Sequence, residues 1–145
     1  EVPTTAAYVI CVSVAGPALQ SLGLPVLQVH LFVFWFALLS TITPPVCGTV
    51  FIAAGMVEEN WLKVAVKAMI LGVGLYLIPL AMVANPELIQ LEAMPVASVT
   101  VTAKIALGLA TISYGIIVPK TYLLRTLFIF SGSVLIFLPL KFVIG

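Results

Sequence analysis

Apolar residues fill the first part of the chain, in runs that are shorter than a membrane span. No charged residue occurs from Val2 to Val57. A helix needs about 20 apolar residues to cross the roughly 30 Å hydrocarbon core of a bilayer. The run Ala6–Leu19 is shorter than this, and Gly16-Pro17 weakens its end. We therefore expect it to form a half-helix or one arm of a re-entrant hairpin.

Two interruptions divide the apolar residues that follow. The turn Leu22-Gly23-Leu24-Pro25 places a proline where a helix can restart, which predicts a half-span over 26–39. The break Ser40-Thr41-Ile42-Thr43-Pro44-Pro45 ends it, and a third short helix is predicted over 46–57. Lipid cannot satisfy a broken backbone. The break must therefore face protein or a polar cavity, as in the discontinuous helices of transporters.

The second part of the chain contains longer apolar segments. Asn60 is a suitable cap for the first of them, and Pro79 is expected to kink that helix late. We expect Lys104, the one charge in the next segment, to extend to the nearer membrane interface. A loop is predicted over 84–97 and a tight turn at Pro119–Tyr122. The predicted spans are 61–83, 98–118 and 123–140.

Composition agrees with a membrane location. The chain is 63% hydrophobic and 8% charged, with a mean hydropathy of +1.30, whereas soluble domains have about 25% charged residues. The predicted fold is an all-α polytopic membrane protein. We expect a hairpin arm and a discontinuous helix in 1–60, a spanning helix and loop in 61–97, and two transmembrane helices in 98–145. The net charge of +1 gives no indication of nucleic-acid binding.

Catalytic groups are scarce. His30 is the only histidine, there is no aspartate, and none of the five glutamates lies within a predicted span. We therefore expect neither enzyme activity, nor a cofactor, nor a carboxylate proton relay. His30 is expected to be a packed or interfacial residue. Cys11 and Cys47 lack the spacing of a disulfide or metal site and are predicted to be small buried hydrophobes.

The remaining candidate chemistry is oxygen ligation of a hard cation such as Na⁺. The prolines of the break leave the carbonyl groups of Leu39, Ser40 and Thr41 without their usual partners, and Thr43 is expected to cap the helix that follows. The segment Val2-Pro3-Thr4-Thr5 repeats the combination of hydroxyls and proline before a half-length helix. The two helix starts are expected to converge on one site, where their N-termini would also favour an anion.

A purely structural interpretation competes with this one. Serine and threonine in membrane helices usually bond to a carbonyl of the preceding turn, and proline often only kinks a helix. For Thr43-Pro44-Pro45 taken alone, this interpretation is slightly favoured. Two uncharged short arms with a double break favour a binding site instead. The alternative function is a non-transporting membrane module or subunit that packs against a partner.

Several separated motifs resemble the large membrane subunit of tripartite ATP-independent periplasmic (TRAP) transporters. The resemblance covers roughly residues 2–90, and the residues after 97 resemble the tail of fused permeases that work with the TAXI type of binding protein. The matching motifs are Pro3–Tyr8 (PTTAAY), His30–Phe34 (HLFVF), Ile42–Val46 (ITPPV), Ala53–Gly55 (AAG) and Asn85–Leu88 (NPEL).

The resemblance implies one half of an inverted-repeat, elevator-type importer of the bacterial inner membrane. Na⁺ would be the coupling ion, and a periplasmic substrate-binding protein would deliver a small carboxylate. Residues 1–19 would be the tip and second arm of a hairpin. Cys47 stands where the family commonly has Gly or Ala. The expected site comprises Pro3, Thr4, Thr5, Ser40, Thr41, Thr43, Pro44, Pro45, Val46 and Gly48, with Thr5, Thr41 and Thr43 as candidate Na⁺ ligands.

The resemblance also implies partners. These are the first inverted repeat, small-subunit-like helices and membrane lipid. Because one repeat supplies only half of a transport cavity, residues 1–145 are not expected to transport alone.

Charge asymmetry predicts the orientation in the membrane, since cytoplasmic loops carry an excess of Lys and Arg. Basic and acidic pairs alternate along the chain: Lys63 and Lys67, then Glu87 and Glu92, then Lys120 and Arg125. The acidic loop should therefore be periplasmic and both basic pairs cytoplasmic. A single cysteine at position 90 should react with an impermeant thiol reagent from the periplasmic side. Labelling of this position only from the cytoplasm would reverse the topology.

Overall fold

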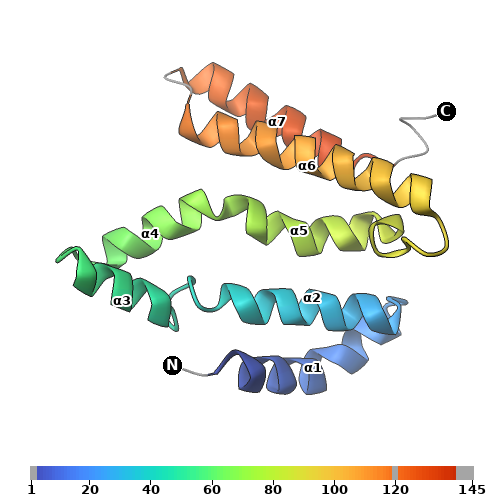
Figure 1. The fold of residues 1–145 in the computed structure, drawn as a ribbon, viewed down its shortest axis with the longest axis horizontal. Helices are drawn as coiled ribbons and strands as arrows, with labels where there is room; N and C mark the ends of the chain where they lie inside the picture. Colours follow the sequence, from blue (N-terminus) through green and yellow to red (C-terminus); the bar gives the residue numbers. More distant parts are fainter. Residues whose placement is uncertain (1–2, 119–120, 140–145) are drawn as a thin grey trace. The chain divides into compact units, whose positions relative to one another are not determined.

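The computed structural model describes residues 3–118 and 121–139, and their regular structure is helical throughout. The all-α prediction is confirmed. Contacts divide the chain into two compact units, one up to Pro79 and one from Leu80 onward. The helices (Figure 1) are α1 Thr4–Ser21, α2 Val26–Leu39, α3 Gly48–Met56, α4 Trp61–Leu71, α5 Val73–Ala84, the short 3₁₀ helix η1 Pro86–Ile89, α6 Pro95–Ile117 and α7 Tyr122–Phe137.

In the first unit, α1 and α2 lie side by side and are joined by a tight turn (Figure 1). The turn uses Gly23 at a φ of 90°, a conformation that glycine adopts without steric penalty. The predicted bounds of α2 are confirmed, with Pro25 at its N-cap. Gly16-Pro17, which was expected to weaken the end of α1, does not end the helix, which continues to Ser21.

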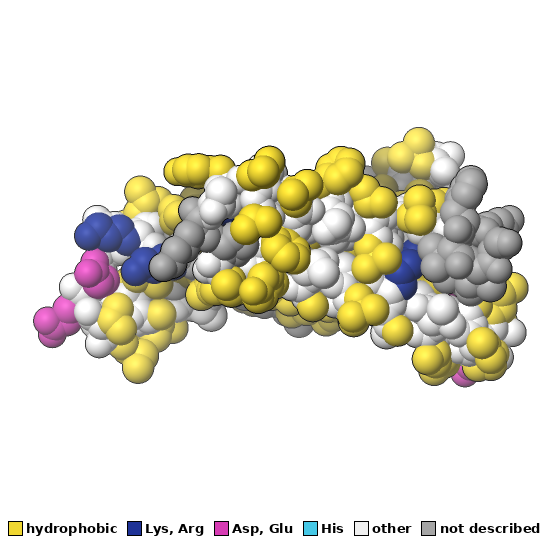
Figure 2. Space-filling view, turned by 90° about the horizontal axis from the view of Figure 1, so that it is seen from above, with side chains coloured by type: hydrophobic (Ala, Val, Ile, Leu, Met, Phe, Trp, Pro, Cys, Tyr) yellow, Lys and Arg dark blue, Asp and Glu magenta, His cyan; other side chains and the backbone are white. Residues whose placement is uncertain are grey.

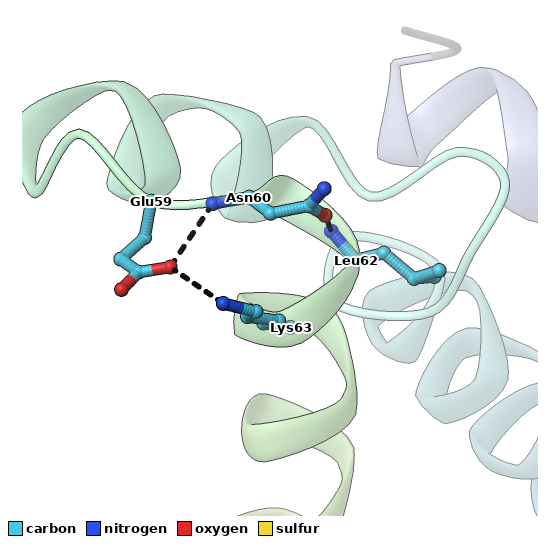
Figure 3. A network of polar contacts seen from close by, with 4 residues as sticks. All are labelled: Glu59, Asn60, Leu62 and Lys63. Atoms are coloured by element: carbon cyan, nitrogen blue, oxygen red, sulfur yellow. Dashed lines mark hydrogen bonds and ion pairs between the residues drawn. The ribbon is translucent and has the colours of Figure 1, made fainter.

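The helix after residue 60 begins as predicted. The side chain of Asn60 accepts a hydrogen bond from the Leu62 backbone N–H at 2.9 Å and caps α4. The carboxylate of Glu59 lies 3.5 Å from the ammonium of Lys63, one turn into the helix (Figure 3). Both ion-pair partners are exposed, so this pair contributes little stability.

The predicted span 61–83 is bent earlier than the kink expected at Pro79. The bend of 45° lies between α4 and α5, and Gly72 is the residue that separates them. A Cβ at Gly72 would lie 3.0 Å from the Ala68 carbonyl oxygen and 3.2 Å from the Ile42 side chain. Packing against the break thus selects glycine here, while Pro79 lies within α5.

In the second unit, α6 and α7 pack closely (Figure 1). Glycines make the approach possible: a Cβ on Gly108 would lie 2.5 Å from the Ile136 side chain, and one on Gly132 would lie 2.7 Å from the Gly108 carbonyl oxygen. Small residues at such crossings are typical of membrane helices. The bounds of α7 differ from the predicted 123–140: the helix begins at Tyr122 and ends at Phe137, and Leu140 lies outside the described residues.

Lys104 does not extend to an interface. Its side chain turns inward and is 6% exposed, and it donates hydrogen bonds to Asn85 and to the carbonyl of Leu138. The prediction that it reaches the nearer membrane surface was therefore wrong, because oxygen acceptors within the protein hold its ammonium.

The described residues contain one helix, α6, that is by itself long and apolar enough to cross a membrane. The bent pair α4 and α5 passes the same test when taken together, and α2 and α7 are shorter apolar helices. Figure 2 shows hydrophobic side chains distributed across the visible face, with few charged groups. Such a surface suits contact with lipid or other apolar helices. Pro119 and Lys120, from the predicted tight turn, lie outside the described residues.

The glycine contacts predict that Gly132→Ala destabilises the protein. The added methyl group would lie 2.5 Å from the Thr111 hydroxyl oxygen and 2.6 Å from the Ile112 side chain, and overpacking of this kind costs about 1–3 kcal/mol. Gly55→Ala is the matched control, since nothing lies within 4 Å of a Cβ there. Thermal unfolding of the purified full-length protein should show a lower Tm for Gly132→Ala only. Equal Tm values for the two variants would contradict the close α6–α7 packing.

Candidate functional site

A groove between α1 and α2 contains the threonines of the first predicted motif. Its volume is about 480 Å³. The Tyr8 hydroxyl lies 2.6 Å from Nδ1 of His30, and the edge of the Tyr8 ring meets Phe34 with centroids 5.9 Å apart. His30 is therefore a half-buried partner of Tyr8, in agreement with its predicted packing role. The groove is lined by Thr4, Thr5, Tyr8, His30, Leu31, Phe34 and Leu38.

The start of α1 lies beside the end of α2. Thr4 and Thr5 share the groove with Leu38, two residues before the break. A second cavity between the same helices, of about 240 Å³, has Ala7 and Ser40 among its lining residues. The two predicted motifs are thus neighbours along the α1–α2 pair. Neither cavity is lined by the break residues beyond Ser40.

The hydroxyl groups of the break all donate to carbonyl groups near the end of α2. Ser40 Oγ donates to the Ala37 oxygen at 2.7 Å, and Thr41 Oγ1 donates to the Leu38 oxygen at 2.8 Å. Thr43 Oγ1 donates to the Leu39 oxygen at 2.7 Å. A hydroxyl that uses its proton in this way keeps lone pairs that can accept a hydrogen bond or coordinate a cation.

Thr43 does not cap the next helix, and that prediction was wrong. The N-cap of α3 is Cys47, and no side chain accepts a capping hydrogen bond there. The Thr43 hydroxyl lies 2.6 Å from the hydroxyl of Tyr76 in α5. Because the proton of Thr43 goes to Leu39, Tyr76 is the donor of this bond. Thr43 therefore attaches the break to α5.

Two of the three carbonyls expected to be free are occupied. The Leu39 oxygen accepts from the backbone N–H groups of Ile42 and Thr43, at 3.2 and 3.1 Å, and also from the Thr43 hydroxyl. The Thr41 oxygen accepts from the Thr49 hydroxyl at 2.6 Å. The break continues the hydrogen bonding of α2 with tighter turns, which the proline pattern alone does not reveal.

The remaining break residues lead directly into α3. The Pro44–Pro45 peptide bond is cis, and the Gly48 N–H donates to the Val46 oxygen at 2.7 Å. Cys47 is fully buried against Val50 and Ala65, as predicted. Cys11, in contrast, is exposed, although it lines the smaller cavity between α1 and α2. That part of the cysteine prediction was wrong.

Sequence reasoning missed Trp35, whose indole Nε1 donates to the Leu75 carbonyl oxygen at 2.8 Å. In an α-helix this oxygen would accept from the N–H of the residue four positions later, which is Pro79 and has no N–H. Trp35 therefore supplies the donor that the proline lacks. Tyr76 and Thr49 were also missed. A polar tip within an apolar helix was the only available signal for them.

Metal binding by side-chain clusters finds no support in the part of the chain that the structure describes. There, no group of three or more His, Cys, Asp or Glu residues is placed to hold a metal ion. Every buried side-chain nitrogen or oxygen of this part also has a hydrogen-bond partner. Hydroxyl and carbonyl oxygens are thus the cation ligands that the site can offer.

An all-helical chain with an apolar exterior and a broken, hydroxyl-rich helix has the features of a membrane transport protein. Residues 1–97 match the family described as the tripartite ATP-independent periplasmic transporter, DctM component. The chain therefore belongs to this family of transporter permease subunits, as the sequence motifs predicted. No curated protein and no solved structure matches it.

Family membership establishes the general role of the chain. It is a component of a TRAP secondary transporter, in a family of inner-membrane proteins that work with a periplasmic binding protein and further membrane components. The family is one of transporters and not of enzymes. The α1–α2 groove and the break lie within the matched residues, whereas α6 lies almost entirely and α7 wholly beyond them.

Trp35 donates to the Leu75 oxygen, which Pro79 leaves without a backbone donor. Substitutions of Trp35 and Pro79 should therefore compensate each other. Trp35→Phe leaves the Leu75 oxygen without its donor, which should destabilise the protein by about 1–3 kcal/mol. Pro79→Ala restores a backbone N–H, so Trp35→Phe should cost less in that background. Trp61→Phe is a control for loss of an indole. Thermal unfolding of the four full-length proteins of the cycle measures the coupling, and additive effects would contradict it.

Proposed function

We propose that the chain is part of a Na⁺-coupled secondary transporter that imports a small carboxylate delivered by a periplasmic binding protein. In this proposal it contributes one half of an elevator-type permease, and the first inverted repeat and small-subunit-like helices complete it. Family membership supports the transport role. The break between α2 and α3 supports the assignment of an ion site to this half.

The arrangement of the break hydroxyls is the observation that carries the ion proposal. Ser40, Thr41 and Thr43 all direct their protons to carbonyls of α2. The outward sides of the Ser40 and Thr41 oxygens therefore carry lone pairs and no proton. The Thr43 oxygen accepts from Tyr76 with one lone pair and keeps a second one for a cation. Half-helix ends and unwound backbone are the usual location of Na⁺ sites in secondary transporters.

The α1–α2 groove is the proposed location of the substrate carboxylate. Thr4 and Thr5 lie in the first turn of α1, where hydroxyl groups and the positive end of the helix dipole favour an anion. Tyr8 and His30 add a polar pair to a groove that is otherwise apolar. Its volume of about 480 Å³ is within the range of small-molecule sites. Thr5 is proposed to bridge this groove and the ion.

One observation favours the competing structural function. The hydrogen bonds of the break hydroxyls are those expected of serine and threonine that only stabilise a helix end. Under that alternative, the break shapes packing against a partner and no ion binds. The two functions differ in whether removal of a break hydroxyl changes the dependence of uptake on Na⁺.

Thr43→Val tests the proposal in the intact transporter, reconstituted with its binding protein. The change keeps the shape of the side chain but removes an oxygen. We expect it to raise the Na⁺ half-saturation of uptake several-fold, since loss of one ligand is worth on the order of 1 kcal/mol. Uptake should be measured at a series of Na⁺ concentrations and at equal protein density.

Thr100→Val is the matched control for this experiment. The Thr100 hydroxyl also donates to a carbonyl of the preceding turn, that of Val96 at 2.7 Å, but no break follows it. This variant should keep the wild-type Na⁺ half-saturation. If Thr43→Val behaves in the same way, the break is structural and the ion proposal fails.

A further inference from the structure

The C-terminal end of α7 lies beside the interior of α6. Lys104 is nine residues after the first residue of α6, about 14 Å along the helix at 1.5 Å per residue. Its Nζ lies 2.6 Å from the carbonyl oxygen of Leu138, the C-cap of α7. α6 is long and apolar enough to cross a membrane, so the end of α7 lies beside the interior of a candidate membrane span.

A helix end in such a location needs donors from the protein. The last carbonyl groups of a helix have no partner within it, the helix dipole makes this end negative, and lipid offers no hydrogen-bond donor. The Asn85 side-chain nitrogen donates to the Ile136 oxygen at 3.0 Å. Lys104 donates to the Leu138 oxygen, so these two side chains supply donors at the end of α7.

The ammonium of Lys104 donates hydrogen bonds to two neutral oxygens. It donates to Oδ1 of Asn85 at 2.7 Å as well as to Leu138, and the two side chains are 6% and 1% exposed. Asn85 is fixed in turn by donating to the Ala81 carbonyl at 3.1 Å. Within the described ranges, the ion pair between Glu59 and Lys63 is the only one. Amide and carbonyl oxygens around one positive charge are the ligands that a monovalent cation takes.

We propose that the Lys104 ammonium is a tethered cation that fills a monovalent-cation site at the C-terminal end of α7. The site is formed by the turn after α5, by α6 and by the end of α7, all within the second unit. In the natural protein it takes no exchangeable ion. When the tether is removed, the same oxygens can bind a small ammonium ion. The proposal does not depend on Na⁺ binding at the break.

Lys104→Ala tests the proposal in the purified full-length permease, in lipid nanodiscs and Na⁺-free buffer. Removal of the ammonium leaves the Leu138 and Asn85 oxygens without their donor, which should lower the Tm by about 5 °C or more. Methylammonium chloride should recover at least half of this loss, because the ion fits the vacated site and has N–H donors. Tetramethylammonium chloride at the same ionic strength should not, because it has none.

Lys67→Ala is the control for loss of a lysine, since Lys67 is exposed. Its Tm should stay close to that of the wild type, and neither protein should respond selectively to methylammonium. The proposal is overturned if Lys104→Ala is as stable as Lys67→Ala. It is also overturned if the two ammonium salts act equally on Lys104→Ala.

Substitution of Asn85 keeps the proposal testable if Lys104→Ala does not fold. Asn85→Asp retains an oxygen ligand for the ammonium, whereas Asn85→Leu removes it. Both variants lose the donor to Ile136, and Asp differs from Leu by an oxygen ligand that also carries a negative charge. Asn85→Asp should therefore have the higher Tm. Equal Tm values, or a higher value for Asn85→Leu, would show that the ammonium needs no oxygen at this position.

Discussion

Backbone carbonyl groups that lose their helical partner must find a donor within the protein, and the described structure depends on this constraint. Lipid supplies no such donor. Trp35 serves the Leu75 oxygen, four residues before Pro79. Lys104 serves the Leu138 oxygen at the end of α7. In each case a polar side chain from another helix donates to a carbonyl oxygen that lacks a helical partner. Hydrogen bonding thus determines which helices must lie together.

The same constraint bears on transport. At the break, hydroxyl protons satisfy the carbonyls of α2, while each hydroxyl oxygen keeps at least one lone pair, Thr43 using its other one to accept from Tyr76. A side chain that closes a helix end can therefore also coordinate a cation. At the end of α7 the arrangement is the reverse, because a lysine supplies both the donor and the positive charge. Under the two proposals, the family-matched residues contain a helix end that binds an ion, and the residues beyond them contain a helix end that binds the ammonium of Lys104.

Close approach of helices at glycine residues is the second feature on which the fold depends. Gly72 separates α4 from α5 next to Ile42, and Gly132 lies against Gly108 where α6 meets α7. Dispersion contacts and not the hydrophobic effect favour such crossings in a membrane, and small residues increase these contacts by letting backbones approach. A larger residue at either position would separate the elements whose polar groups depend on being close.

Local sequence patterns were sufficient to predict the features that depend on neighbours in the chain. Apolar composition predicted an all-helical membrane protein. Pro25 and the break predicted the bounds of α2, and Asn60 was predicted correctly as the cap of α4. Short motifs predicted the family. The tertiary structure decided the partners of the polar side chains. Thr43 bonds Tyr76 and does not cap α3, and Lys104 turns inward. These outcomes follow from contacts over 19 or more residues of separation, and local propensity carries no information about which distant group will lie opposite.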